Sequence, residues 1–174
     1  MKRLAAIAFA FLVAMAMNAQ GLEMLDRVKD SRAVFHYSYL LSRGGAEFSA
    51  VTDGDVTVED NAYVLEGLGL KVTSDGTTRL SLDPDAREAV VETVEKEDIF
   101  TNPALFIGSW RKYASRLKVN SCGKDSMDVT LTLDDDTHAR FVLTGIKFME
   151  KQGMGDFSTD VSSIPAGYLV TDLR

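Results

Sequence analysis

The fold class follows from one stretch in the first half of the chain. Residues 53–94 read DGDVTVEDNAYVLEGLGLKVTSDGTTRLSLDPDAREAVVETV. Apolar and polar residues alternate along it, which is the period of a half-buried β-strand. Four turn signals break the alternation, at Asp53-Gly54, Asp60-Asn61, Asp75-Gly76 and Asp83-Pro84-Asp85. Asp-Gly is among the strongest hairpin signals, because glycine accepts positive φ and aspartate tolerates it. Strands joined by such short links pair antiparallel, and we therefore expect an antiparallel meander.

Further strands are expected on both sides of this stretch. Residues 34–41 alternate and place Phe35, Tyr37 and Tyr39 on one face. The other expected strands are residues 47–52 with Phe48, 116–120, 127–133, 138–143 with Phe141, 146–150 and a late edge strand at 168–172. Residues 134–136 and 144–145 are predicted to be tight links. A meander of about ten strands should curl or close, because sheets twist and exposed edges are a hazard.

Two short helices are expected beside the strands. Leu22, Leu25 and Val28 recur at helical spacing within residues 21–31,. Residues 103–113 begin with a proline, which a first helical turn accommodates, and Phe106 and Trp110 belong to their apolar stripe. No repeat and no linker-like composition divides the chain. We therefore expect a single α+β, mostly β domain at residues 20–174.

Composition excludes several classes of protein. Of the 174 residues 45% are hydrophobic, which suffices for a packed core,. A net charge of −7 lacks the footprint of a nucleic-acid binder,. The single cysteine, Cys122, excludes a disulfide scaffold and a cysteine-based zinc site,. Two histidines without helical spacing do not indicate a typical zinc site,. No nucleophile elbow or phosphate loop is present, so we expect neither an enzyme nor a cofactor.

The first 19 residues have the pattern of a secretory signal peptide. Lys2 and Arg3 precede an apolar run of 14 residues, Leu4–Met17, which is short for a bilayer-spanning helix of ~20 residues. Cleavage is expected at Ala14-Met15-Ala16 or at Ala19-Gln20, and a membrane-anchoring helix is the alternative. A bacterial lipoprotein needs a cysteine at its cleavage point, and none lies near the end of this run. We therefore expect an exported protein without a lipid anchor.

The order of these features resembles the lipoprotein carriers of the LolA/LolB type, and is most similar to the shorter LolA-like proteins of Bacteroidetes-type bacteria. The resemblance covers about residues 22–174. Its motifs are Ser74-Asp75-Gly76-Thr77-Thr78, Asp83-Pro84, Asn102-Pro103, Phe157, Pro165-Ala166-Gly167-Tyr168 and Val170-Thr171-Asp172-Leu173-Arg174. It implies one antiparallel meander curved into an incomplete, open β-barrel, with an apolar concave face and short helices that form a lid.

The resemblance also implies a function. Proteins of this type are monomeric periplasmic carriers, not enzymes. They hold the acyl chains of a lipoprotein and take it from an inner-membrane release complex to an outer-membrane receptor. The missing cysteine fits the soluble carrier rather than the membrane-anchored receptor.

One motif of the family is absent. The better-known carriers place an Arg-Pro pair and an aromatic residue on the strand before the Ser-Asp-Gly turn, and that arginine latches the lid. Residues 58–63 read VEDNAY, in which Tyr63 can stand for the aromatic residue but nothing replaces the arginine. After the turn, where the family has an aromatic residue, this chain has Arg79 or Leu80. A LolA-like fold that serves another lipid is therefore an open alternative.

The aromatic residues are the candidates for lining an acyl-chain cavity and its lid. They are Phe35, Tyr37, Tyr39, Phe48, Tyr63, Phe106, Trp110 and Phe141. The alternative is an ordinary sheet core, in which Phe106 and Trp110 would plug the interior rather than cover a cavity. Two further functions stay open: a protein-interaction or envelope-stress sensor module without carrier activity, and an unrecognised hydrolase.

Overall fold

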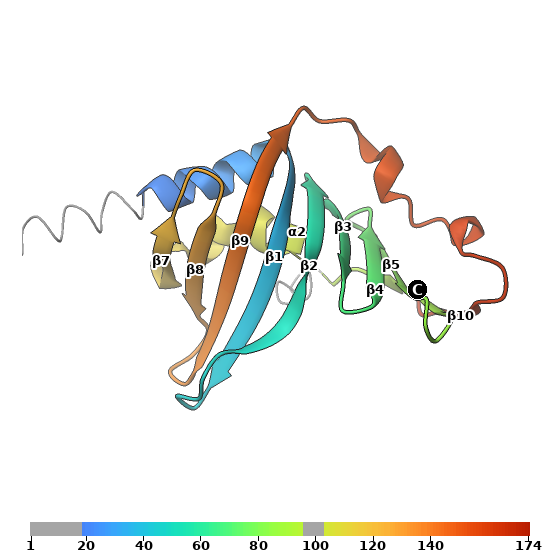
Figure 1. Ribbon diagram of the computed structural model, residues 1–174, viewed down its shortest axis with the longest axis horizontal. Coiled ribbons are helices and arrows are strands. Elements are labelled where there is room, and N and C mark those ends of the chain that lie inside the picture. The colour runs from blue at the N-terminus through green and yellow to red at the C-terminus, as the bar shows by residue number, and fades with distance from the viewer. Residues whose placement is uncertain (1–18, 96–102) are drawn as a thin grey trace, which may run out of the picture.

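The computed structural model describes residues 19–95 and 103–174, and Figure 1 shows how its elements are arranged. Residues 1–18, which hold the predicted signal peptide except for its last position, lie outside the described residues, as do residues 96–102.

The described residues form one mixed sheet, a helix at residues 19–30 and several short helical turns. The strands are β1 (Arg32–Arg43), β2 (Ser49–Glu59), β3 (Ala62–Gly67), β4 (Leu70–Ser74), β5 (Thr78–Asp83), β6 (Glu88–Thr93), β7 (Leu117–Cys122), β8 (Met127–Thr132), β9 (Thr137–Met149) and β10 (Leu169–Asp172). The helical turns are α2 (Pro103–Ser109), η1 (Trp110–Arg116), η2 (Met154–Phe157) and η3 (Val161–Ser163).

The sheet is open. Its ten strands follow the order β10-β6-β5-β4-β3-β2-β1-β9-β8-β7, with β10 and β7 at opposite ends. All neighbours pair antiparallel except β10, which lies parallel to β6. The prediction of a mostly β fold with a long meander and a late edge strand is thus confirmed.

Two predicted turns are wrong, because the glycines concerned lie inside strands. Gly54 is in the middle of β2, opposite Tyr37 of β1. Gly145 lies within β9, at a point where β9 has one residue more than the segment of β1 from Val34 to His36 with which it pairs. That mismatch is a β-bulge, and its extra residue favours a glycine at positive φ, here 65°,. Residues 47–58 and 138–150 therefore each contribute one strand rather than two.

Only the first part of the predicted helix at 103–113 is α-helical. The α-helix ends at Ser109 and continues as a 3₁₀ helix to Arg116. Gly108 and Ser109 are weak helix formers, which fits a change of helix type at this point.

The core lies between the sheet and the helices. Phe35 and Tyr37 of β1 face the helix at 19–30 and α2, and we call this side of the sheet the inner face. Figure 1 shows both helices behind the strands, on the same side of the sheet. On the opposite, outer face, Ile164 and Tyr168 pack against Leu80, Ala89 and Val91. The C-terminal segment, residues 150–172, therefore covers the outer face over β5 and β6 and ends as the edge strand β10.

Candidate functional site

The inner face carries a groove where β2 and β3 separate. β2 pairs with β1 from Ser49 onwards, but with β3 only between Asp55 and Glu59. At the branch the two backbones touch through glycines: a Cβ atom on Gly67 would lie 2.0 Å from the carbonyl oxygen of Asp53. Beyond this contact the first half of β2 diverges from the β3–β4 hairpin and leaves a space between them.

The groove is mostly apolar and has a volume of about 220 Å³. Its described lining residues are Val51, Thr52, Leu65, Gly67, Leu68, Leu70, Val72, Arg79 and Ser81. Three of them expose much of their surface, with Val51 at 44%, Leu68 at 69% and Leu70 at 40%. Large apolar side chains that gather around a hollow on the surface are typical of ligand-binding and interaction sites.

The turn between β3 and β4 holds a leucine in an unfavourable backbone conformation. Leu68 has φ of 52° and Gly69 has φ of 78°, so both central residues of this two-residue link adopt positive φ. Such a turn favours Asn, Asp or Gly, and a large side chain at positive φ costs about 1–2 kcal/mol. An exposed leucine at that position is therefore a reason to look for a function of its side chain.

Arg79 supplies the charge of the groove. Arg79 and Ser81 extend from β5 to the inner face, in register with Ser74 and Val72 of β4. The guanidinium Nε donates to Glu92 Oε1 at 3.0 Å. Burial opposes its charge, but the hydrogen bond to Glu92 and the nearby Tyr63 outweigh burial and raise the pKa of Arg79.

Seven of the eight predicted lining residues lie together on the inner face. The buried cluster contains Phe35, Tyr37, Tyr39, Tyr63, Phe106, Trp110 and Phe141. Phe106 of α2 stacks on Phe141 of β9 with ring centroids 3.9 Å apart, and Tyr39 stacks on the same ring at 5.2 Å. These aromatic rings fill the space under α2.

The buried cluster contains one polar group of particular interest, the hydroxyl of Tyr37. Its side chain is buried, and its hydroxyl has no hydrogen-bond partner among the described residues. Burial raises its pKa well above the ordinary value. An unpaired buried hydroxyl costs about 1–3 kcal/mol, so such a group calls for an explanation.

Phe48 is not brought together with the other seven. It lies just before β2, is 37% exposed, and has the guanidinium of Arg140 at 5.9 Å from its ring centroid. Arg140 pairs with Leu40, so it points to the outer face rather than towards the helices,.

Asp26 ties α2 and η1 to the N-terminal helix. The Trp110 indole donates to Asp26 Oδ1 at 3.2 Å, and Arg111 Nη2 donates to Asp26 Oδ2 at 2.8 Å. The β2–β3 turn also reaches α2, because a Cβ on Gly108 would lie 3.6 Å from the Asn61 side-chain oxygen. This turn lies in the stretch where the carriers that the sequence resembles have their latch arginine.

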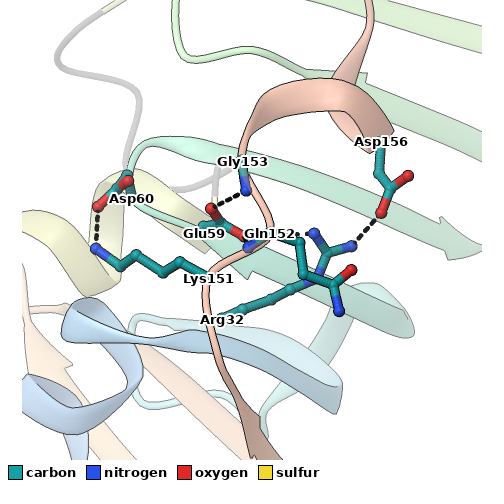
Figure 2. A network of polar contacts seen from close by, with 7 residues as sticks. All are labelled: Arg32, Glu59, Asp60, Lys151, Gln152, Gly153 and Asp156. Atoms are coloured by element: carbon teal, nitrogen blue, oxygen red, sulfur yellow. Dashed lines mark hydrogen bonds and ion pairs between the residues drawn. The ribbon is translucent and has the colours of Figure 1, made fainter.

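Glu59, in the same stretch, holds the C-terminal segment instead. Figure 2 shows its carboxylate facing the backbone of that segment. It accepts the N–H groups of Gln152 at 3.1 Å and Gly153 at 2.8 Å, and Arg32 Nη1 at 3.3 Å. Burial opposes the charge of Glu59, but these donors outweigh it and lower its pKa. Arg32 also pairs with Asp156.

The Ser-Asp-Gly turn holds the same segment at a second point. Asp75 Oδ1 accepts the N–H groups of Thr77 and Thr78, and Asp75 Oδ2 accepts the Thr159 hydroxyl at 2.8 Å. Burial opposes the charge of Asp75, and these hydrogen bonds outweigh it and lower its pKa. One of the motifs on which the family resemblance rests is thus a turn that anchors residues 150–172.

Sequence reasoning missed the groove itself. Val51, Leu65, Leu70 and Val72 read as ordinary strand residues, and the space between them depends on where β2 leaves β3. Gly54 and Gly67 were the available signal, since a glycine inside a strand can mark a close approach of two backbones. Within the described residues no cluster of three or more His, Cys, Asp or Glu side chains is placed to hold a metal ion. None of the described helices is long and apolar enough to cross a membrane.

No model of a known protein family matches the chain, and no curated protein matches it.

Proposed function

We propose that this protein is a periplasmic carrier that binds the acyl chain of a lipoprotein or related lipid on its inner face and takes it towards the outer membrane. The observation that carries the proposal is the apolar groove beside the aromatic core of an open sheet. Burying an acyl chain there gains about 0.8 kcal/mol for each CH₂ group. The protein is then a binder rather than an enzyme.

The proposal gives α2 and η1 the role of a lid over an incomplete barrel. The groove of about 220 Å³ is smaller than the ~300–1,000 Å³ of most ligand pockets. A longer chain needs the space that Phe106 and Trp110 now fill. This helical segment is short, and Asp26 holds it through the buried Trp110 and the exposed Arg111. The unpaired hydroxyl of Tyr37 supports the same idea, because a ligand carbonyl entering this face could accept its hydrogen bond.

A second function has its own supporting observation. The aromatic side chains of the inner face already pack against one another, with Phe106 directly on Phe141. A filled interior favours an interaction module or envelope-stress sensor that uses the same fold without carrying lipid. This function requires a stable protein partner, whereas the carrier requires bound lipid.

The experiment is native mass spectrometry of the full chain expressed in a Gram-negative host and purified from the periplasmic fraction. The carrier function predicts adducts with lipid or lipoprotein mass, which organic extraction removes. A Leu70→Glu variant should lose them, because it places a charge in the groove. Leu173→Glu is the matched control, since Leu173 is equally apolar and 63% exposed beyond β10. Lipid-free protein that forms a crosslink to one protein partner in cells would contradict the carrier and favour the interaction module.

A further inference from the structure

The two edges of the sheet are built differently. The edge strand β7 has features that block pairing with another chain: an exposed lysine, Lys118, and a register irregularity between Val119 and Ser121,. The N-terminal helix also packs on β7, since a Cβ on Gly21 would lie 2.7 Å from the Val119 side chain. At the opposite edge, β10 has no lysine, proline or register irregularity, and within the described ranges β6 is the one strand paired with it. The β10 edge is therefore open to a further strand.

The open edge of β10 presents the backbone groups of Val170 and Asp172. The N–H groups of Leu169 and Leu173 donate towards β6, to carbonyl oxygens at 2.9 and 2.8 Å. Backbone groups of successive strand residues point to opposite edges, so the N–H and C=O groups of Val170 and Asp172 point away from β6. Four backbone groups are thus placed to bond an added strand.

The side chains of β10 make this edge apolar on the inner face. Thr171 lies beside Val90 of β6, which pairs with Ser81 on the inner face. Leu169 and Leu173 share that face, because they are two residues from Thr171 on either side. They are 66% and 63% exposed. Exposed leucines beside an unpaired strand edge are typical of an interaction surface.

The sequence of β10 is complementary to itself in one antiparallel register. If Thr171 lies opposite Thr171 of a second copy, each Leu169 lies opposite a Leu173. These are non-hydrogen-bonded pairs, in which the side chains come closest. Sliding the strands by one pair in one direction places Asp172 opposite itself, where like charges repel. Sliding them in the other direction places Leu173 opposite Gly167 and loses the leucine pairs.

We infer that β10 is a dimerisation edge, through which two copies of this chain pair antiparallel with Thr171 at the twofold axis. The axis is perpendicular to the sheet, so the two inner faces and their grooves lie on the same side of one joined sheet. One short strand from each copy buries less than the about 1,200 Å² of a standard interface, so we expect dissociation at micromolar to millimolar concentration. The inference differs from the monomer that the family resemblance implies, and it does not rest on the proposed function.

Disulfide trapping tests the register. Thr171→Cys in a Cys122→Ser background should give a covalent dimer on mild oxidation, because partners in a non-hydrogen-bonded pair have Cα atoms about 4.5 Å apart, which a disulfide spans. Val170→Cys in the same background is the matched control. It is equally a residue of the exposed edge, but its counterpart in the second copy is a diagonal neighbour, too distant for a disulfide. Equal crosslinking of the two variants would overturn the inference.

Sedimentation equilibrium of the full chain, from low micromolar to near-millimolar concentration, tests the dimer itself. Val170→Pro should weaken it at least about tenfold, because two hydrogen bonds across the axis are lost. The ladder with β6 stays intact, since proline is tolerated where the N–H faces the free side of an edge strand. Val170→Thr keeps the N–H and should dimerise like the parent chain. A parent chain that is monomeric at every concentration would overturn the inference and leave the edge to a strand of another protein.

A charge pair tests the same contact without changing the backbone. Leu169→Lys should weaken the dimer, because the lysine then faces Leu173 of the second copy. Adding Leu173→Glu should restore much of the affinity, since the new charges lie opposite each other across the axis but four residues apart within one chain. A dimer that survives both Val170→Pro and Leu169→Lys unchanged would place the interface elsewhere and overturn the inference. Circular dichroism checks that each variant is folded.

Discussion

The backbone N–H of Gly153 donates to the carboxylate of Glu59 across 2.8 Å, and this contact joins the C-terminal segment to the start of the meander. Gly153 has φ of 80°, so the chain turns sharply where it leaves β9 and meets the carboxylate. Together with the Gln152 N–H and Arg32, this contact satisfies a carboxylate that is only 3% exposed. Removing one partner of a buried, fully paired carboxylate of this kind strongly destabilises the fold.

Glu59→Gln should therefore destabilise the protein by about 2–3 kcal/mol, because it leaves Arg32 without its buried counterion and removes one acceptor. Urea denaturation gives the change in the free energy of unfolding. Hydrogen exchange should also show faster exchange at the N–H groups of Gln152 and Gly153. The control is Glu66→Gln, whose exposed carboxylate pairs with Lys71 and should matter by less than about 1 kcal/mol. Equal effects of the two variants would contradict the anchoring role.

Acid should loosen the C-terminal segment. The pKa values of Glu59 and Asp75 are lowered in the folded chain, for the reasons given above. A carboxyl group with a lowered folded pKa stabilises the fold above its unfolded pKa, and the contribution is lost as pH falls through the folded pKa. The free energy of unfolding should thus be level near neutral pH and fall below about pH 4.5, near the ordinary carboxyl pKa.

The measurement is urea denaturation between neutral pH and pH 3, with limited proteolysis of residues 150–172 alongside. The double variant Glu59→Gln, Asp75→Asn should show a flatter profile, because the titrating groups are gone. An unchanged slope in that variant would assign the acid sensitivity to other carboxyl groups, such as Asp128, whose pKa Arg140 and Asn120 lower against the opposing effect of burial.

The succession of strands along the chain was largely predictable from the sequence, but their order across the sheet and the shape of the site were not. Alternation and Asp-Gly or Asp-Pro turns are local signals, and they correctly placed the turns after Ser74 and after Asp83. Gly54 and Gly145 carry the same local signal but lie inside strands, because close packing and a bulge also require glycine. The sequence pattern cannot separate these cases, since the partner strand decides between them.

The same limit applies to the candidate site. Phe35, Tyr37 and Tyr39 were predicted to share one face, and they do. Whether that face lines a cavity or a core depends on α2, and Phe106 fills the space. The groove depends on the divergence of β2 from β3, which is a property of the folded sheet rather than of any one segment. Gly54 and Gly67 mark a close approach of two backbones,, but the sequence does not show which strands meet there or where they separate.

Leu68→Asn should stabilise the fold and weaken ligand binding. Asparagine tolerates the positive φ at this turn, so the free energy of unfolding should rise by up to about 1 kcal/mol. The same change removes an apolar side chain from the rim of the groove. Thermal unfolding and decanoate titration measure the two effects. Arg87→Asn is the control, because Arg87 also has positive φ, 54°, in the β5–β6 turn away from the groove. It should stabilise without changing affinity, and a loss of affinity in both variants would contradict the assignment.

Tyr37→Phe should cost the ligand-free protein little stability or raise it by about 1 kcal/mol, because the hydroxyl it removes is buried and unpaired,. If the ligand accepts a hydrogen bond from this group, the variant should also bind decanoate several-fold more weakly. Urea denaturation without ligand and titration with ligand separate the two effects. A clear loss of stability without ligand would show that the hydroxyl has a partner in solution.

Trp110 reports whether the helical segment moves when ligand binds. It is the single tryptophan of the chain, is 5% exposed, and is held to the N-terminal helix through Asp26. If α2 and η1 form a lid, a ligand that enters beneath them must displace the Trp110 indole and change its fluorescence.

Asp26→Asn weakens the attachment of both Trp110 and Arg111, so it should lower the energetic cost of opening the lid. Because a rarely populated open state reduces apparent affinity, the variant should bind the ligand more tightly. Fluorescence titration of the parent chain and of the variant gives both quantities. Binding that leaves Trp110 fluorescence unchanged, with equal affinity in Asp26→Asn, would confine the ligand to the groove and remove the lid from the proposal.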